Sequence, residues 1–433
     1  MKREKSIAAA LALSSALAAT PALAGGFYVQ EQSAIEAGRA YSGEAAAADS
    51  GATIFFNPAG MTELEGINFE AGGQLLFVTA RQENTGSTRT VPGAAGTFPV
   101  TGSDGGNPFA QPIPIPSFYA SAQLSDRVWV GLGVNSPFGV ASGYEDDFFG
   151  RFDAVQADLL TFNVQPSVAF KVSENLSIGG GVDIQYIHTT LVNALPNLAP
   201  SWPAGRFEIE GDDISLGFNV GALIKAGPLR FGAHYRSQVE HLLEGPLELS
   251  GLEGPLAVQN GTYDATTPIT MPDIATLSVA IDPGGKWRGY ATARHYDWSD
   301  FDRIDFITAQ LPTTTSPQNY ADTMSIAAGG EYDFSGRLTL RAGTMWDESP
   351  VGDTFRSTRV PDGDRTWLSA GATYRLGGHM ALNLAYSHVF VASEPVNRVS
   401  NFYTGSPAQT TVVTRSNSTG DADILAFSLS TRF

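Results

Sequence analysis

The sequence predicts an all-β fold, a transmembrane antiparallel β-barrel of fourteen strands. Three observations predict it. Stretches of about ten residues alternate apolar with polar or small side chains, the connections between them alternate in length, and the chain ends in an apolar, aromatic strand. Beyond residue 24 no apolar run reaches roughly 18 residues, which excludes a helical membrane protein.

The bulk composition narrows the class of protein. The chain has 433 residues, with 44 acidic against 26 basic side chains and no cysteine. An acidic balance argues against nucleic acid as a partner, because phosphate binding needs a basic surface. The lack of cysteine removes disulfides, thiolate metal sites and thiol catalysis. The high counts of glycine, 47, and phenylalanine, 25, together with weak helix signals, favour an all-β chain.

Residues 1–24 have the features of a secretory signal peptide. Basic residues within 2–5 precede an apolar run over 7–19, and the small-x-small sequence Ala-Leu-Ala follows at 22–24. The alternative, a transmembrane anchor, would need roughly 20 apolar residues, and this run is shorter. We therefore expect the mature chain to begin at Gly25.

The alternation is clearest in 160–171, LTFNVQPSVAFK. Its even positions, from Leu160 to Phe170, are apolar, whereas its odd positions, from Thr161 to Lys171, are polar or small. A transmembrane strand presents such lipid-facing and lumen-facing sets, and a bacterial barrel has an even number of them. Fourteen candidate segments are found: 67–80, 114–124, 127–140, 159–171, 175–190, 207–225, 228–243, 273–282, 286–298, 322–334, 337–348, 366–377, 379–391 and 422–433.

The connections support the same interpretation. Tight turns such as 282–285 and 377–378 are interspersed with long insertions at 81–113, 244–272 and 392–421. Outer-membrane barrels have short turns on one rim and long loops on the other. A soluble sandwich has no reason to separate its loops by length in this way.

The C-terminal sequence DILAFSLSTRF places Leu425, Phe427, Leu429 and the terminal Phe433 on one face. It resembles the C-terminal signature by which the barrel assembly machinery recognises outer-membrane barrels. An ordinary edge strand is the alternative, but an exposed apolar edge would be an aggregation site. We expect a monomer in the bacterial outer membrane, in contact with outer-membrane lipid and lipopolysaccharide.

Residues 25–66 do not alternate. The sequence GRAYSGEAAAADSGATIFFNPAGMTELEG closely resembles the N-terminal hatch of the FadL family, outer-membrane transporters for long-chain fatty acids and other hydrophobic compounds. The resemblance implies that 25–66 is a hatch plugging a fourteen-stranded barrel over 67–433, and that transport is passive. Blocks at 135–186, 271–304 and 340–376 also resemble the family, whereas no match is assigned for 81–113, 191–205 and 244–272.

The hatch residues singled out are Phe55, Phe56, Asn57, Pro58 and Ala59. A residue before proline is held extended, and an asparagine side chain can bond its own downstream backbone, so the chain turns here. The functional interpretation is a hatch turn wedged in the lumen, with the two phenylalanines against the wall or the ligand. The alternative is a folding plug that never touches substrate.

The segment VWVGLGVNSPFGVASG contains a break in the third predicted strand, at Gly133, Asn135, Ser136, Pro137 and Gly139. Proline removes a ladder donor, and glycine permits a bulge or an inward bend. The strand could instead simply end here. In the FadL family this strand carries an inward kink that opens the barrel wall, so the resemblance implies a lateral opening. A sideways exit avoids releasing hydrocarbon into water, which costs roughly 0.8 kcal/mol per methylene.

A fatty acid would also need a cation for its carboxylate. By strand parity Arg230, Arg236, Arg294 and Arg341 are expected to face the lumen and are candidates for that role. The alternative is a structural network in which lumenal carboxylates, such as Asp183, balance them.

Enzymatic motifs are absent from the sequence. It contains no HExxH, no GxSxG and no phosphate-binding loop with Gly-Lys-Ser/Thr, so no catalytic residue, metal or cofactor is predicted. An outer-membrane lipase and a polar-solute porin are the weaker alternatives, and an open porin would not carry a partly apolar plug. The predicted cargo is a hydrophobic small molecule: a long-chain fatty acid or, alternatively, an aromatic hydrocarbon or alkane. The long loops could in addition serve as a phage or adhesion receptor.

Overall fold

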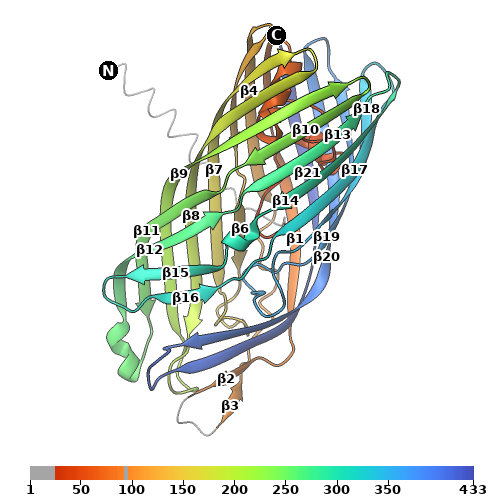
Figure 1. Ribbon diagram of the computed structural model, residues 1–433. Helices are drawn as coiled ribbons and strands as arrows, with labels where there is room; N and C mark the ends of the chain where they lie inside the picture. Colours follow the sequence, from red (N-terminus) through yellow and green to blue (C-terminus); the bar gives the residue numbers. More distant parts are fainter. Residues whose placement is uncertain (1–24, 92–95) are drawn as a thin grey trace, which may run out of the picture.

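The computed structural model describes residues 25–91 and 96–433, and the predicted signal peptide lies outside these residues. The described chain forms a closed antiparallel β-barrel of fourteen wall strands (Figure 1). The predicted fold class and strand number are thereby confirmed. No helix in the described part of the chain is long and apolar enough to cross a bilayer.

Each wall strand pairs with its neighbour in chain order, and the last pairs with the first. In register, Asn68 lies opposite Arg432 and Asn84 opposite Ser416, which closes the wall. The wall strands are β1 (Ile67–Asn84), β4 (Ile113–Ser125), β5 (Val128–Asn135), β7 (Gln156–Ser173), β8 (Leu176–Leu195), β9 (Gly205–Ala226), β10 (Leu229–Arg236), β13 (Ile274–Ile281), β14 (Trp287–Tyr296), β17 (Thr323–Asp333), β18 (Leu338–Asp347), β19 (Arg365–Arg375), β20 (Met380–Phe402) and β21 (Thr410–Arg432).

Several further strands extend the wall at one end of the barrel, where Figure 1 shows β2, β3, β15 and β16. Four of them follow an interruption in a wall strand or pair beside it: β6 (Gly139–Gly143), β11 (Val239–Ser250), β12 (Gly261–Met271) and β15 (Arg303–Thr308). The others form hairpins: β2 (Thr88–Thr90), β3 (Thr97–Pro99) and β16 (Thr314–Pro317). Two 3-10 turns, η2 (Gly254–Gln259) and η3 (Trp298–Asp300), complete this end.

Four wall strands, β1, β8, β20 and β21, extend beyond their predicted bounds at the end that carries the long connections. The predicted strands 127–140 and 228–243 are instead each divided, into β5 and β6 and into β10 and β11. The insertion 392–421 is largely a hairpin of β20 and β21, which pair as far as Phe402 opposite Thr410. Much of 244–272 is likewise a hairpin of β11 and β12. The lipid-facing pattern stops where the wall leaves the membrane, so these extensions lack the outward apolar face that predicts a membrane strand.

The alternation of side chains follows the wall as expected. In β7 the lumenal Thr161, Asn163 and Gln165 are fully buried, whereas Val168 and Phe170 on the other face are exposed. Exposed large apolar side chains recur on the outward face of nearly every wall strand. An outward apolar face and a polar lumen are the pattern of a barrel that sits in lipid.

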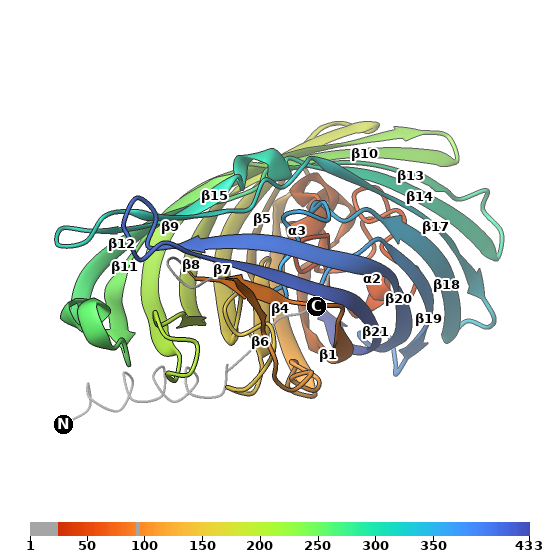
Figure 2. The same cartoon turned by 90° about the horizontal axis from the view of Figure 1, so that it is seen from below.

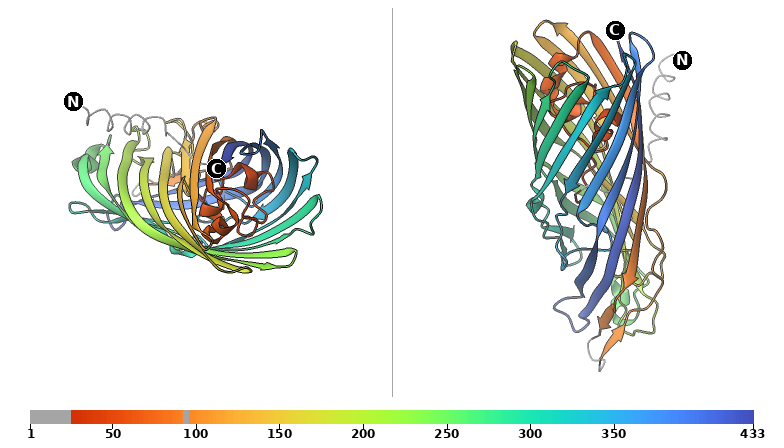
Figure 3. Two further views of the ribbon diagram at one scale, coloured as in Figure 1. Left: turned by 90° about the horizontal axis from the view of Figure 1, so that it is seen from above. Right: turned by 90° about the vertical axis from the view of Figure 1, so that its right-hand side faces the viewer.

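The two rims differ in construction. Short turns join the strands at the end that carries the C-terminus, and long hairpins stand at the other (Figures 1 and 3). We call these the short-turn rim and the long-loop rim.

Candidate functional site

The N-terminal segment, residues 25–66, lies inside the barrel, as the views along the barrel show in red and orange (Figures 2 and 3). It contains the short helices α2 (Ala34–Ala37) and α3 (Thr53–Phe56) and the 3-10 turn η1 (Pro58–Glu63). α2 packs against β19, β20 and β21, and η1 packs against β7, β8 and β9. The segment therefore spans the lumen between opposite walls.

Glycines in the wall let the backbone of this segment come close. A Cβ atom at Gly343 would lie 2.2 Å from the carbonyl oxygen of Arg39, and one at Gly232 would lie 1.9 Å from that of Ala45. No other residue fits at such distances. These wall positions are thus shaped for the segment that fills the lumen.

Asn57 holds the turn between α3 and η1. Its backbone is extended, with φ −170°, as expected before Pro58. Its side chain accepts a hydrogen bond from Ala59 N at 3.1 Å and donates to the carbonyl oxygens of Ala45 at 2.7 Å and Ala222 at 3.0 Å. Ala222 belongs to β9, so this asparagine fastens the turn to the barrel wall.

Phe55 and Phe56 pack edge to face, with ring centroids 5.0 Å apart. The guanidinium of Arg236 lies over the Phe55 ring at 4.4 Å and donates to the Phe55 carbonyl oxygen at 3.1 Å. Phe56 packs beside Tyr41 within the same segment. Both phenylalanines are buried, so the structure brings the five predicted hatch residues together inside the barrel.

Buried ion pairs tie the segment to the wall. Arg39 is fully buried and contacts Glu36 at 2.6 Å, Asp49 at 2.8 Å and Glu331 of β17 at 2.7 Å. Removing one partner of such a pair would leave an uncompensated buried charge. These contacts fix the N-terminal segment in the lumen.

The four arginines proposed as partners of a ligand carboxylate each lie near a carboxylate side chain of the protein itself. Three form buried ion pairs on the lumenal side: Arg236 with Asp183, Arg294 with Glu44 and Arg341 with Glu331. Arg230 is more exposed, and its closest carboxylate oxygen, on Glu63, is 3.9 Å away. The network that the sequence left as an alternative is therefore present, and a ligand role for these four stays a prediction.

The third wall strand is interrupted at the residues that the sequence singles out. β5 ends at Asn135 and β6 begins at Gly139, and both pair with β7. Between them Ser136 is turned into the barrel, where its hydroxyl donates to the Thr161 carbonyl oxygen at 2.6 Å. Gln32 of the N-terminal segment donates to the Ser136 carbonyl oxygen at 2.7 Å.

The inward-turned residues pair with the N-terminal segment instead of with β4. Val29 N donates to the Pro137 carbonyl oxygen at 2.7 Å, and Gly139 N donates to the Phe27 carbonyl oxygen at 2.8 Å. Tyr28 and Phe138 form an antiparallel bridge between these bonds. Residues 27–29 thus act as a short strand laid against the break.

The facing strand, β4, is left with an unpaired edge. Its pairing with β5 begins only at Phe118, while residues 113–117 pair with β1 alone. Pro114 and Pro116 lie in this stretch, and since a proline has no N–H, their nitrogens face away from β1 toward the missing neighbour. The wall therefore lacks strand hydrogen bonds between β4 and β6.

Aromatic side chains surround this break on the lumenal side. The ring of Phe27 lies 4.7 Å from that of Trp298, 5.1 Å from that of Phe301 and 6.2 Å from that of Phe138. Gly25 N donates to Asp347 at 2.8 Å and holds the start of the described chain in place. An apolar environment therefore lies beside the interrupted strand.

The lumen near the long-loop rim is also apolar. The rings of Phe207 and Phe306 lie 5.0 Å apart, and Ile209, Leu243 and Leu247 belong to the same buried cluster. These residues lie in or next to the insertions whose ligand-binding role the sequence could not assign. This apolar cluster therefore lies where a molecule entering from the long-loop rim would first reach the lumen.

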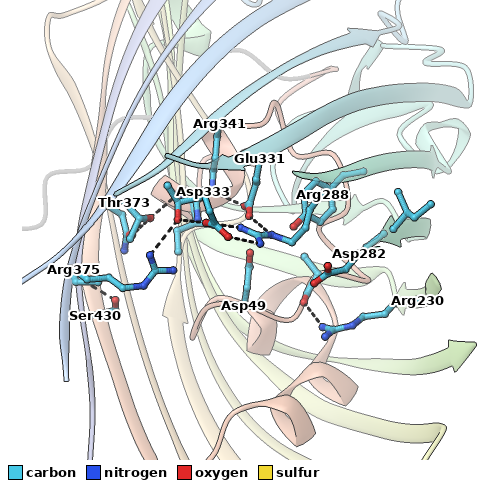
Figure 4. A pocket seen from close by; sticks show the side chains of 18 residues that line it. Asp49, Arg230, Asp282, Arg288, Glu331, Asp333, Arg341, Thr373, Arg375 and Ser430 are labelled. Carbon is cyan, nitrogen blue, oxygen red and sulfur yellow. Dashed lines mark hydrogen bonds and ion pairs between the residues drawn. The ribbon is translucent and has the colours of Figure 1, made fainter. Parts of the chain in front are cut away.

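The end toward the short-turn rim has the opposite character. A cavity of about 350 Å³ opens there, shown in Figure 4. Arg288 bridges Glu331 and Asp333 across it, and Arg375 donates to Thr339 at 3.2 Å. Its charged lining residues are Asp49, Arg230, Asp282, Arg288, Glu331, Asp333, Arg341 and Arg375. Hydrocarbon would gain nothing by entering such a charged cavity.

Metal ligation has little support. The described residues contain no group of three or more histidine, aspartate or glutamate side chains placed to hold a metal ion. Three lumenal carboxylates, those of Glu44, Asp183 and Glu331, form ion pairs with arginines.

A closed fourteen-stranded antiparallel barrel with an outward apolar face and a polar lumen defines an outer-membrane β-barrel protein. Residues 15–433 match the family model described as outer membrane protein transport protein (OMPP1/FadL/TodX). The chain belongs to this family, and its place is the bacterial outer membrane.

Relatives agree with this assignment. The chain is 26% identical over 416 residues to the long-chain fatty acid transport protein of Escherichia coli O6:H1, a match covering 88% of this chain and 90% of that one. It is also 26% identical over 416 residues to outer membrane protein P1 of Haemophilus influenzae, covering 88% and 89%. The likeness to such transport and outer-membrane proteins points to a transporter rather than an enzyme.

Solved structures share the fold. A FadL homologue of Pseudomonas aeruginosa superposes with a TM-score of 0.83 at 24% identity, covering 94% of this chain and 100% of that one. The toluene transporter TbuX of Ralstonia pickettii superposes with a TM-score of 0.63 at 17% identity, covering 94% and 99%.

Two features next to the break were not predicted from the sequence: the unpaired edge of β4 and the pairing of Phe27 and Val29 with the inward-turned residues. The prolines of PIPIPS at 112–117 are a readable signal, because proline every second residue is incompatible with a strand that is paired on both sides. The pairing of Phe27 and Val29 with the break carries no such signal. Nothing in the alternation of residues 25–66 indicates a strand there.

Proposed function

We propose that this protein transports long-chain fatty acids or similar hydrophobic molecules passively across the outer membrane. Cargo binds first to the apolar surface at the long-loop rim, moves to the aromatic region beside Phe27 and Phe138, and leaves sideways between β4 and β6 into the bilayer. The N-terminal segment serves as the hatch that blocks the direct way through.

The unpaired edge of β4 opposite the inward turn at Ser136 is the observation that carries the proposal. Along this stretch β4 has no strand neighbour on one side, so cargo could pass the wall there without breaking strand hydrogen bonds. The charged cavity at the short-turn rim supports the sideways exit, because releasing hydrocarbon there costs roughly 0.8 kcal/mol per methylene.

The three residues laid against the break act as the gate in this proposal. Phe27 and Val29 bond the inward-turned strand and bury its lumenal side. Cargo that reaches the break has to displace them. The backbone bonds to Pro137 and Gly139 and the aromatic contacts of Phe27 oppose this displacement, as do the flanking bonds of Gly25 and Gln32. Binding of an apolar molecule among the same rings would offset those lost contacts.

Aromatic hydrocarbons are the second candidate cargo. The likeness in fold to the toluene transporter TbuX favours it, as does the density of aromatic rings beside the break. The relatives named as fatty acid transporters match this chain more closely in sequence, at 26% against 17% identity, and favour the fatty acid.

The test is uptake by cells that lack their own transporter of this kind and carry this gene or an empty vector. Labelled oleate and labelled toluene are supplied separately, and native mass spectrometry of the purified barrel identifies any co-purified molecule. Oleate uptake above the vector level supports the first cargo, and toluene uptake alone supports the second. High conductance for polar solutes without uptake of either molecule would contradict the proposal.

A further inference from the structure

Arg89 lies on the inner face of the barrel mouth. It is the central residue of β2 and stands opposite Val412 of β21, whose even-numbered residues face the lumen. Val412 is buried, and so is Arg89, with 7% of its surface exposed. Figure 1 shows β2 at the long-loop rim. Its guanidinium therefore sits inside the mouth, away from the lipid side of the wall.

Arg89 differs from the other buried arginines in having no carboxylate. Among the described residues eight arginines are buried, and seven of them form ion pairs with a carboxylate. The Nε and Nη2 atoms of Arg89 are buried and have no hydrogen-bond partner within the described chain. The seven paired arginines are Arg39, Arg236, Arg294, Arg341, Arg356, Arg365 and Arg398.

The surroundings of Arg89 add positive charge and a second unsatisfied group. Its guanidinium and that of Arg151 lie over the ring of Phe152, at 5.9 Å and 5.0 Å from the centroid. Arg151 donates to the carbonyl oxygen of Thr101. Because Arg151 is itself a cation, it does not neutralise Arg89. The hydroxyl of Tyr403 is buried and also lacks a partner among the described residues. We call Arg89, Arg151, Phe152 and Tyr403 the outer arginine cluster.

Burying the unpaired guanidinium of Arg89 costs free energy unless an anion binds beside it. Burial lowers the pKa of Arg89 and raises that of Tyr403 well above its ordinary range, although the positive charge of Arg89 opposes the second shift. A buried charge is tolerated when it is paired and hydrogen-bonded. The planar guanidinium fork matches the two oxygens of a carboxylate. Val100 and Phe402, packed around Phe152, add apolar surface for a hydrocarbon chain.

We propose that the outer arginine cluster binds the carboxylate of an incoming amphiphile, with Arg89 as the bidentate partner and the Tyr403 hydroxyl as an additional donor. The inference rests on the proposed uptake of hydrophobic cargo and adds that the preferred cargo carries an acid group. Lipid headgroups of the surrounding membrane do not compete, because Arg89 faces the interior of the mouth. The site selects acids at entry, before the apolar path begins.

The test compares two ligands with the same chain, oleate and oleyl alcohol, on the full-length purified barrel. Affinities are measured by calorimetry for the wild type, Arg89→Gln and Arg89→Lys. The control variant is Arg415→Gln, because Arg415 is an exposed arginine on the outer face of β21, bonded to Asn397 and without a carboxylate partner among the described residues. Heat-modifiable migration on gels verifies that each variant is folded.

We expect Arg89→Gln to weaken oleate binding about tenfold, a loss of about 1.4 kcal/mol, and to leave oleyl alcohol unchanged. Arg89→Lys should retain part of the preference for the acid, and Arg415→Gln should match the wild type. Equal oleate affinity in wild type and Arg89→Gln would overturn the inference, as would an equal loss for acid and alcohol. Loss of co-purified lipopolysaccharide phosphorus without a change in oleate affinity would also overturn it. If the wild type binds neither ligand, the proposed function itself fails.

Discussion

The carbonyl oxygen of Pro137 accepts a hydrogen bond from the backbone N–H of Val29, 2.7 Å away. A residue of the barrel wall therefore finds its strand partner in the segment that fills the lumen. The state of the N-terminal segment and the state of the wall are coupled through this pair, and a molecule that moves one has to disturb the other.

The first prediction concerns the turn at Ser136, whose side chain is buried where the wall strand bends inward. Ser136→Arg should fill the space between β4 and β6 and reduce oleate uptake about tenfold or more, to the vector level. Ser125→Arg, at the exposed short-turn end of β4, is the matched control and should transport normally. Wild-type uptake by a folded Ser136→Arg barrel would rule out the sideways exit.

The second prediction concerns Asn57. Asn57→Ala removes the donors to Ala45 and Ala222, and a buried carbonyl group left without a partner costs about 1–3 kcal/mol. The N-terminal segment should loosen while the wall stays closed, so uptake should change and protease should reach residues 45–60. Deletion of 57–59 should impair uptake more strongly, again without unfolding the barrel.

Limited proteolysis followed by mass spectrometry measures this loosening. Asn68→Ala is the control, because that half-buried side chain bonds the nearby Glu65 carbonyl oxygen and lies outside the N-terminal segment. Equal protection of residues 45–60 in Asn57→Ala and in the wild type would show that the turn does not depend on this side chain.

The third prediction concerns the close approach at Gly343. Gly343→Ala places a methyl group 2.2 Å from the Arg39 carbonyl oxygen, and overpacking of this kind typically costs about 1–3 kcal/mol. We expect the N-terminal segment to be displaced and its hydrogen exchange around Arg39 to accelerate. Gly336→Ala, which meets open space, should leave exchange unchanged.

The fourth prediction concerns Glu31, whose carboxylate oxygens are buried without a hydrogen-bond partner among the described residues. Burial raises its pKa from 4.5 to about 8, although Arg365 and Arg294 oppose the shift and Asp347 adds to it. The folded protein therefore holds a proton that the unfolded chain releases above about pH 4.5. Stability contributed at this position should fall as pH rises from about 4.5 and level off above about 8.

Hydrogen exchange of residues 25–33 at pH 6 and pH 9 measures this effect once the intrinsic pH dependence is removed by comparison with Glu31→Gln. The wild type should open more at pH 9 relative to that variant, whereas the two should behave alike at low pH. Identical pH responses of the two proteins would show that ionisation of Glu31 does not affect the stability of residues 25–33.

The wall strands could be predicted from the sequence because their alternating pattern is set within each strand. A strand between lipid and lumen has to alternate, and LTFNVQPSVAFK alternates whatever lies around it. The break at Ser136 and Pro137 was visible for the same reason, since proline and glycine disturb the ladder in their own neighbourhood. The hairpins beyond the membrane were missed because they have no outward apolar face that would mark them as membrane strands.

The partners within the lumen could not be predicted, because they join residues far apart in the sequence. Parity places Arg236 and Asp183 on lumenal faces, but only the barrel register brings them together. Parity likewise gives no sign that Arg89 lacks the carboxylate that the other buried arginines of the described chain possess. Whether a lumenal charge has an ion-pair partner depends on which strands the closed barrel brings together.

Pro114 and Pro116 have one further consequence. A strand edge with free N–H groups is a template on which another chain can extend the sheet, and an outer membrane is crowded with barrels and with chains still folding. These two residues have no N–H group to donate along the unpaired edge of β4. A strand of another chain can therefore form too few hydrogen bonds to pair with this edge. The gap in this wall is thereby kept from being sealed by a neighbouring protein, although lipid can still reach it.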